Sequence, residues 1–274
     1  SQHVTATFDD GSPEEADILV GADGFRSAVR AQMLPDVQPA FAGYVVWRAV
    51  TDEASLSGPV HDTVFREFGL FAPNGTQIIG YPIAGVGNDL RPGHRRYNFV
   101  WYSAVTPDEL RDMLTDGEGR HHPVSIPPPL IRDDVLCRME DDARRRLPPA
   151  FVEILQQSER PFFTPIYDHC SPSFADGRVA LAGDAACVAR PHVGMGVTKA
   201  AEDALALARH LGAAPIADAL DAYSRERVPA SRKAYERAQR LGGFIFDGPA
   251  GQNLDGRGHP DLDTIMRDTA VPVT

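Results

Sequence analysis

The sequence predicts a mixed α/β protein, and three observations carry this prediction. Two strand-turn-helix units occur towards the ends of the chain, at residues 17–30 and 178–211. Between them, residues 41–102 form aromatic-rich β runs separated by Gly, Pro and Asn turns. The chain has 274 residues, of which 43% are hydrophobic and 24% charged, so it can bury a sizeable core. We therefore expect an antiparallel sheet inserted between two parts of one α/β domain.

The N-terminal segment is expected to form a hairpin that leads into a helix. Alternating apolar residues at 4–8 and an apolar strand at 16–20 flank a turn. The second strand runs into the glycine-containing turn 21–24 and then into a helix-like run at 25–34. Ligands bind at the carboxyl ends of strands in such units.

Helices are expected after the β-rich segment. Residues 106–109, Thr-Pro-Asp-Glu, form a capping box with proline at the first helical position. The run 131–147 carries acids early and arginines late, as the helix dipole favours, and 151–157 predicts a short third helix. The arginines at 144–146 are expected on a solvated face.

The C-terminal part predicts a strand, a ligand-binding turn and two long helices. The strand 178–182 stops at Gly183-Asp184, and apolar residues at helical spacing follow from 197 to 211. A second helix is expected at 216–241, with a kink or break at Pro229. Asp184 at a strand end suits sugar-type hydroxyls, and a turn-forming aspartate is the alternative.

The composition excludes several classes of protein. The net charge is -11, which argues against a nucleic-acid surface because phosphate binding needs clustered Lys and Arg. No apolar run approaches the length of a membrane span, and the first residues show no signal pattern. We expect a cytoplasmic protein that binds neither nucleic acid nor membrane.

The metal-ligating and thiol side chains point to no metal site or disulfide framework. Cys137, Cys170 and Cys187 are widely spaced and odd in number, which favours reduced thiols. The adjacent pair His121-His122 would face apart on either regular element, so a solvated loop is favoured over a metal site.

Two motifs resemble those of a known family. "DILVGADGFRSAVR" and "GRVALAGDAACVARPHVGMGVTKAAEDALALARHL" closely resemble the DG and GD motifs of the FAD-dependent aromatic hydroxylases, the para-hydroxybenzoate hydroxylase-like class A flavoprotein monooxygenases. "AGYVVWRAV", "YPIAG" and "YNFVWY" look most like the 2,6-dihydroxypyridine 3-hydroxylase branch. The resemblance spans nearly the whole chain. It implies an FAD-binding Rossmann-like domain with an inserted antiparallel substrate sheet.

The resemblance implies a reaction and a set of site residues. In this family NAD(P)H reduces FAD, O2 adds to give a flavin C4a-hydroperoxide, and a small aromatic or N-heteroaromatic ring receives one oxygen. The residues implied to bind FAD are Asp23, Gly24, Arg26, Gly183, Asp184, Pro191, Gly194, Met195, Gly196 and Val197. Pro191 and His192 are the expected catalytic residues, with His192 as proton acceptor, and a histidine that only packs or caps is the alternative. Aromatic residues expected to contact the substrate are Tyr44, Trp47, Tyr81 and Tyr102.

The sequence departs from the family pattern at one point. Family members begin with a strand-loop-helix unit carrying G-x-G-x-x-G, which holds the FAD pyrophosphate. No G-x-G string of this chain opens such a unit near the N-terminus. A fragment of a longer protein, a separate chain that supplies the missing segment, and a degenerate relative all account for this. A homodimer is a further partner arrangement that the sequence leaves open.

These considerations give the expected domains and an alternative function. Residues 1–40 and 166–241 are expected to form the FAD-binding domain, 41–165 the substrate domain and 242–274 a C-terminal tail. The alternative to an FAD-dependent monooxygenase is a non-catalytic aromatic-binding remnant without flavin. Such a remnant would bind aromatic ligands and lack reductase activity.

Overall fold

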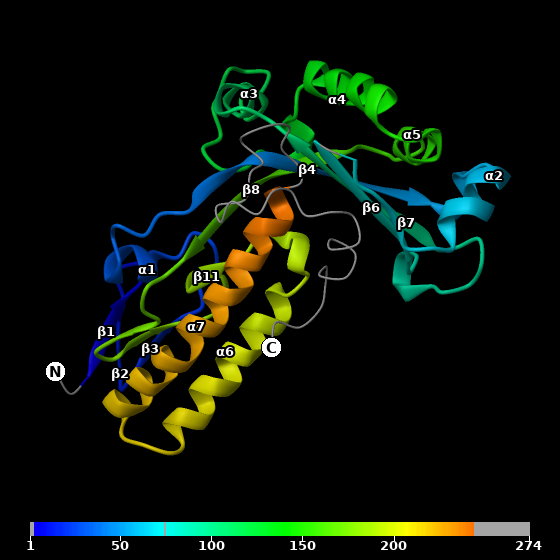
Figure 1. The fold of residues 1–274 in the computed structure, drawn as a ribbon. Coiled ribbons are helices and arrows are strands. Elements are labelled where there is room, and N and C mark those ends of the chain that lie inside the picture. The colour runs from blue at the N-terminus through cyan, green and yellow to red at the C-terminus, as the bar shows by residue number, and fades with distance from the viewer. Residues whose placement is uncertain (1–2, 74, 244–274) are drawn as a thin grey trace. The chain divides into compact units, whose positions relative to one another are not determined.

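The computed structural model describes residues 3–73 and 75–243. The described chain divides into two compact units. Unit 1 contains residues 3–40 and 167–242, and unit 2 contains residues 41–166. The tail expected at 242–274 lies almost entirely outside the described residues. The mixed α/β class with antiparallel sheets is confirmed (Figure 1).

Unit 1 contains a hairpin and a small sheet. The hairpin pairs β1 (Val4–Thr7) with β2 (Pro13–Ala16), and the sheet has the order β3-β10-β9. β3 (Leu19–Gly21) pairs in parallel with β10 (Val179–Leu181), which pairs antiparallel with β9 (Ala175–Asp176). The predicted strand 16–20 is therefore wrong as one element. The charged segment that ends at Ala16 is exposed and pairs with β1. The apolar segment that begins at Leu19 pairs instead with β10, which is mostly buried.

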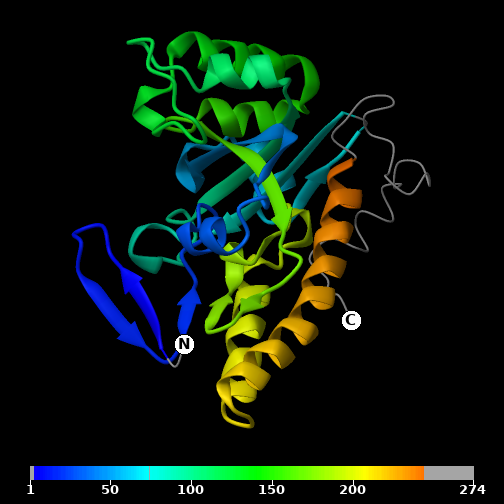
Figure 2. The same cartoon turned by 90° about the vertical axis from the view of Figure 1, so that its left-hand side faces the viewer.

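Three helices complete unit 1. They are α1 (Ala28–Met33), α6 (Gly196–Leu211) and α7 (Ile216–Gly242). α6 and α7 run side by side in both views (Figures 1 and 2). The helix does not break at Pro229, because α7 continues through this residue to Gly242. Their buried faces join β10 in one core, which includes Phe174, Leu181, Ala206, Leu207, Leu220 and Tyr223.

Unit 2 is built on an antiparallel sheet. β4 (Ala40–Asp52) pairs with β7 (Arg96–Ala104), β7 with β6 (Thr76–Ile83), and β6 with β5 (Gly69–Phe71). β8 (Phe162–Cys170) lies next to β4, and its last residues belong to unit 1, where they pair with β11 (Cys187–Val188). The predicted antiparallel sheet between residues 41 and 102 is thus confirmed.

One face of this sheet is covered by α3 (Pro107–Met113), α4 (Asp133–Arg146) and α5 (Pro149–Gln156). The predicted capping box is confirmed, since the Glu109 amide donates to Thr106 Oγ1 and the Thr106 amide donates to Glu109 Oε2. Short helical turns occupy Glu53–Ser55, Gly58–Val60, His61–Phe65, Val86–Asn88, Pro128–Leu130, Gly183–Ala185 and Pro191–Val193. No described helix is long and apolar enough to cross a membrane.

Candidate functional site

The two glycine turns lie side by side in unit 1. Leu181 of β10 stands opposite Gly21 of β3 in parallel register, and the Ala182 amide donates to the Gly21 carbonyl at 3.0 Å. Parallel strands bring their carboxyl ends to one edge of a sheet, where α/β proteins bind ligands. Turns 22–24 and 182–184, remote in sequence, therefore share one candidate site.

A buried ion cluster holds the turn at Gly183. The Gly183 amide donates to Asp203 Oδ2 at 3.0 Å, and Lys199 Nζ donates to the Gly183 carbonyl at 2.8 Å. Asp203 also accepts from Lys199 Nζ at 3.2 Å and from Arg227 Nε at 2.8 Å. Gly183 has a φ of 62°, a conformation that favours glycine. The cluster thus fixes both polar backbone groups of a turn that glycine makes accessible.

Arg30 ties the two turns together. Its Nη2 donates to the Phe25 carbonyl at 2.8 Å, and its Nη1 donates to the Ala185 carbonyl at 3.2 Å. The same Nη1 lies 3.0 Å from His169 Nε2. Since arginine can only donate, His169 Nε2 accepts and its proton sits on Nδ1. Burial first, and then the charge of Arg30, lowers the pKa of His169 to about 4, so this imidazole is neutral at pH 7.

Polar groups at the turn remain available to a ligand. Asp184 is exposed, and its carboxylate makes no hydrogen bond within the described residues. α6 begins at Gly196 and has no side-chain cap. The amides of its first turn therefore present partial positive charge to the same region. A groove of about 690 Å³ opens here and is lined by Val20, Ala22, Ala182, Gly183, Asp184, Gly196, Val197, Ala200, Ala204, Leu207, Ala208 and Leu211.

The segment between β11 and α6 carries the other predicted C-terminal site residues. Pro191 and His192 lie in one helical turn, which Gly194 ends at a φ of 62°, and Met195 precedes α6. Burial, with a smaller contribution from Arg190, lowers the pKa of His192 to about 3. The imidazole is neutral and weakly basic, which disfavours the predicted proton-acceptor role.

The N-terminal site residues have mixed roles. Asp23 Oδ2 accepts from the amides of Ala28 at 2.7 Å and Val29 at 3.2 Å, the first two residues of α1, whose N-cap is Ser27. Gly24 has a φ of 78°, and Arg26 is exposed. Gly24 and Arg26 are therefore open to a ligand, whereas Asp23 also holds the local structure.

The predicted substrate residues divide between the two faces of the unit 2 sheet. Tyr44 and Tyr102 lie on the face opposite to α3, α4 and α5, with ring centroids 6.1 Å apart. Tyr81 shares this face by strand register, and its ring stacks on Phe68. Trp47 lies on the helix-covered face and packs against Phe163 at 5.1 Å. Side chains alternate along a strand, so residues 44 and 47 cannot share a face of β4.

Three polar residues on the Tyr102 face were not predicted from the sequence. Gln77 stands directly opposite Tyr102, and Arg48 and Asn98 lie in the next rows. Gln77 is 2% exposed, and its Oε1 has no hydrogen-bond partner among the described residues. Burial raises the pKa of Tyr102 to about 12 although the Arg48 charge lowers it, so this phenol keeps its proton. Period-two alternation from Tyr44 would have identified Arg48.

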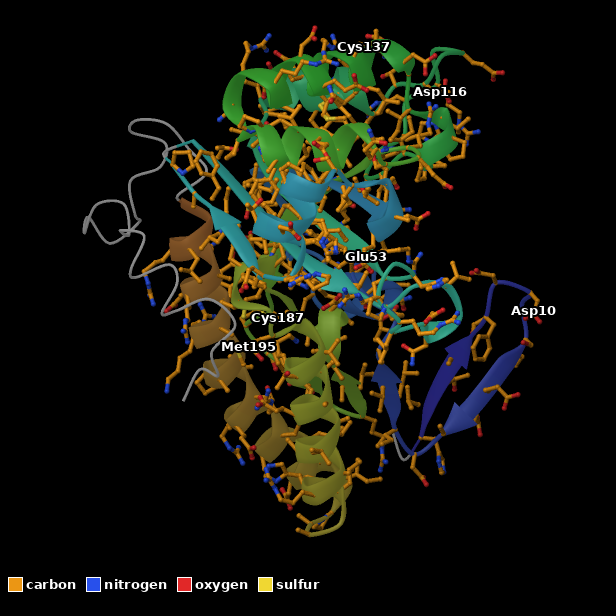
Figure 3. The ribbon with its side chains drawn as sticks, turned by 90° about the vertical axis from the view of Figure 1, so that its right-hand side faces the viewer. Asp10, Glu53, Asp116, Cys137, Cys187 and Met195 are labelled. Atoms are coloured by element: carbon orange, nitrogen blue, oxygen red, sulfur yellow. The ribbon has the colours of Figure 1, made fainter. Side chains whose placement is uncertain are left out.

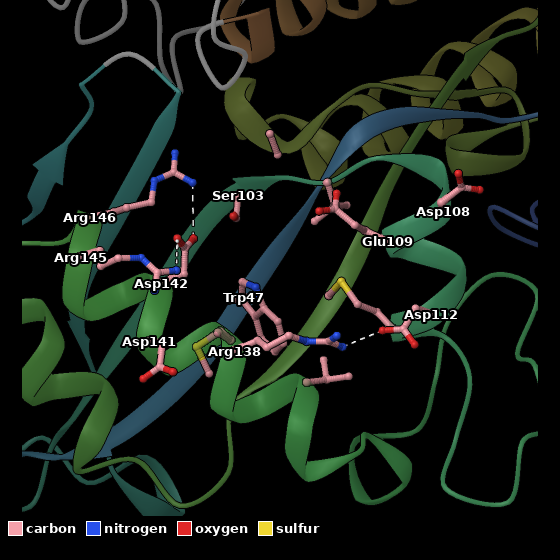
Figure 4. A pocket seen from close by; sticks show the side chains of 15 residues that line it. Trp47, Ser103, Asp108, Glu109, Asp112, Arg138, Asp141, Asp142, Arg145 and Arg146 are labelled. Carbon is pink, nitrogen blue, oxygen red and sulfur yellow. Dashed lines mark hydrogen bonds and ion pairs between the residues drawn. The ribbon is translucent and has the colours of Figure 1, made fainter.

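A second cavity, of about 720 Å³, lies on the helix-covered side of unit 2 (Figure 4). Trp47 and Ser103 line it from the sheet, and charged residues line it from α3 and α4. Arg138 pairs with Asp112 at 2.6 Å, and Arg146 pairs with Asp142 at 3.4 Å. These charges pair with one another, as expected of a solvated helix face.

Comparisons with known proteins show which family the chain resembles. An FAD binding domain model matches residues 138–238, and an FAD binding domain-like model matches residues 41–168. The 2,6-dihydroxypyridine 3-monooxygenase of Paenarthrobacter nicotinovorans is 34% identical over 76% of this chain and 51% of its own length. The structure of 2,6-dihydroxypyridine-3-hydroxylase from Arthrobacter nicotinovorans gives a TM-score of 0.82 at 28% identity, covering 96% of this chain and 67% of that one. The chain thus resembles FAD-dependent aromatic hydroxylases over most of its length.

A further relative is named for another substrate. The 3-amino-4-hydroxybenzoate 2-monooxygenase PtnB3 of Streptomyces platensis is 30% identical over 96% of this chain and 60% of its own length. The predicted resemblance, including its likeness to the dihydroxypyridine branch, is thus confirmed. This chain spans about half to about two thirds of the length of these relatives.

Proposed function

We propose that this chain forms the flavin- and substrate-binding part of an FAD-dependent monooxygenase. This enzyme would hydroxylate a small aromatic or N-heteroaromatic ring with NAD(P)H and O2. The observation that carries the proposal is the juxtaposition of turns 22–24 and 182–184 beside the uncapped start of α6. We propose that it acts in the cytoplasm, where NAD(P)H is supplied.

The residues present fit the sugar-like and ring portions of FAD. Asp184 offers an unpaired carboxylate for ribityl or ribose hydroxyls, and Gly183 keeps the backbone beneath it free of a side chain. Gly194, Met195, Gly196 and Val197 would border the ring, together with Pro191. The α6 amides would stabilise negative charge on the reduced ring. When bound, FAD supplies hydride acceptance from NAD(P)H and activation of O2.

The substrate would bind on the sheet face that carries Tyr44, Tyr81 and Tyr102. Tyr102 keeps its proton and can donate to a ring oxygen, while Arg48 offers positive charge to a phenolate. The primary amide of Gln77 carries both a donor and an acceptor, which complements the adjacent N–H and C=O groups of a hydroxypyridine in its lactam form. Trp47 would support this face from behind, and His192 would pack at the flavin side.

A further polypeptide segment would complete the FAD site. β3 forms the edge of the sheet described here, and beside it lies the groove with exposed Val20 and Val197. An exposed edge and an apolar groove favour a covering element. We propose a strand, a glycine turn and a helix, contributed in the same chain or by a separate one, because the relatives are longer than this chain. A homodimer is the competing occupant.

FAD titration of the purified protein, followed by its visible spectrum and intact mass, tests this proposal. We expect a bound-flavin spectrum and a weaker FAD affinity in Asp184→Ala than in the control Asp218→Ala, an exposed acid on α7. The flavin-loaded protein should oxidise NAD(P)H faster with a hydroxypyridine or phenol and yield a product with one added oxygen. Binding of aromatic ligands without flavin uptake, in protein whose intact mass shows that the completing segment is present, would instead support the non-catalytic remnant.

A further inference from the structure

Two of the three cysteines, distant in sequence, face each other in unit 1. Cys170 ends β8, and Cys187 begins β11, one residue after the Gly183–Ala185 turn. The antiparallel register places Cys170 opposite Cys187 and His169 opposite Val188. Both thiols are free, with Cys170 half-buried and Cys187 fully buried.

The hydrogen-bond pattern shows which kind of strand pair they form. The Ser171 amide donates to the Ala186 carbonyl at 3.0 Å, which is the bond that follows a non-hydrogen-bonded pair at 170 and 187. In such a pair the Cα atoms lie about 4.5 Å apart, and the side chains approach more closely than in the alternate pair. A disulfide spans Cα separations of about 4.4–6.8 Å. The backbone is therefore already arranged for a bond between these sulfurs.

The surroundings distinguish the two thiols. The neighbouring Cys187 thiol is the main cause that lowers the pKa of Cys170, and the charges of Arg232 and Lys199 act in the same direction, against burial and Glu236. Cys170 and burial raise the pKa of Cys187. Cys170 is thus the more accessible and more readily ionised sulfur, and Cys187 is its protonated neighbour.

We propose that Cys170 and Cys187 form a redox-active dithiol, which a hydroperoxide converts into a cross-strand disulfide beside the flavin-site turn. The Cys170 thiolate attacks hydrogen peroxide, breaking the O–O bond and giving a sulfenic acid and hydroxide. The Cys187 sulfur then displaces the sulfenic oxygen, forming the S–S bond as its thiol proton leaves with that oxygen as water. The two sulfurs lose two electrons in total, and peroxide gains them.

The disulfide would anchor the start of β11 to β8. Cys187 lies two residues after Ala185, whose carbonyl accepts from Arg30, and the Cys187 thiol contacts the Ser231 carbonyl of α7 at 3.9 Å. The disulfide would therefore restrain residues 185–187, which contact both Arg30 and α7. Reduction by a dithiol would restore the original state.

Mass spectrometry of the wild-type chain tests the proposal without flavin, so its failure leaves the proposed function untouched. The protein is treated with hydrogen peroxide, quenched, denatured and alkylated with N-ethylmaleimide. We expect a loss of two hydrogens, alkylation of Cys137 alone, and a peptide that links Cys170 to Cys187, all reversed by dithiothreitol. Alkylation of all three cysteines, or Cys170 oxidised to sulfinic acid beside a free Cys187, would overturn the proposal.

Variants separate the roles of the two sulfurs. Cys187→Ser should accumulate a Cys170 sulfenic acid that dimedone traps, whereas the wild type should show little of it. Cys170→Ser should leave Cys187 reduced. Cys137→Ser is the matched control, because Cys137 is exposed on α4 of unit 2 (Figure 3), and it should form the disulfide as the wild type does. Equal dimedone labelling of Cys187→Ser and wild type would exclude Cys187 as the resolving thiol.

Discussion

Replacement of Asp203 by alanine tests whether the buried ion cluster holds the flavin-site turn. Asp203 is fully buried, and its carboxylate accepts from the Gly183 amide, Lys199 Nζ and Arg227 Nε. The alanine variant would leave two cationic side chains, 3% and 7% exposed, without this partner. Removing one partner of a buried ion pair costs about 3–5 kcal/mol. Since a domain has about 5–15 kcal/mol of stability, unit 1 should become marginal.

Urea unfolding provides the assay. Far-UV circular dichroism follows the helices, of which α6 and α7 are the longest described. Trp47 and Trp101 are the two tryptophans and both belong to unit 2, so tryptophan fluorescence follows that unit separately. Asp203→Ala should lower the midpoint of the dichroism transition by far more than that of the fluorescence transition.

Two further variants provide an intermediate and a control for the stability loss of Asp203→Ala. Asp203→Asn keeps an acceptor for the Gly183 amide but removes the charge, so we expect an intermediate loss. Glu226→Ala removes an exposed acid on α7 that pairs with Arg209 and His210, and it should cost no more than about 1 kcal/mol. A loss below about 1 kcal/mol for Asp203→Ala would refute the reasoning.

Three other predictions follow from the structure. Glu53, labelled in Figure 3, accepts from Arg95, and this contact is the main cause that lowers its pKa to about 2. The folded pKa of Glu53 lies below its unfolded value, so the ionised carboxylate stabilises the folded state. This contribution to the free energy of unfolding is full above about pH 4.5 and is lost as the pH falls towards 2. Glu53→Gln should flatten the acid dependence of tryptophan-detected unfolding there, and an unchanged profile would contradict this. His169 has a folded pKa of about 4 against 6.5 unfolded, so unit 1 should lose stability as pH falls from about 6.5 to 4, by up to about 1.4 kcal/mol per pH unit. His169→Gln should reduce that slope in far-UV dichroism, and a slope equal to that of the wild type would reject His169 as its source. Gln77→Leu should raise the dissociation constant of a hydroxypyridine about 10- to 100-fold while leaving that of a simple phenol nearly unchanged, and equal effects on both in equilibrium titration would refute the lactam contact.

The local structure could be predicted because its causes lie within a few residues. Thr106 and Glu109 form their capping box across one helical turn, so the start of α3 is encoded locally. The same holds for the strand-glycine-helix pattern around Gly183, whose positive φ favours glycine. The two motifs together sufficed for the family resemblance.

The faces of the sheet were only partly predictable. The alternation along β4 places Tyr44 and Trp47 on opposite sides, but the sequence did not reveal which side the helices cover. Gln77 was overlooked because a polar residue in a β run is ordinary. Its unusual property is a buried carbonyl oxygen that has no partner among residues 3–73 and 75–243, and this depends on strands β6 and β7 being in register.

The sequence by itself determined most of the elements, the glycine turns and the family that this chain resembles. The tertiary structure alone decided which distant residues meet: Gly21 with Leu181, Asp203 with Arg227, and Cys170 with Cys187. The physical reason is that turns and caps are set by short-range sterics and hydrogen bonds. Strand register and buried ion pairs depend instead on which apolar faces pack together, and residues far apart in the chain contribute to those faces.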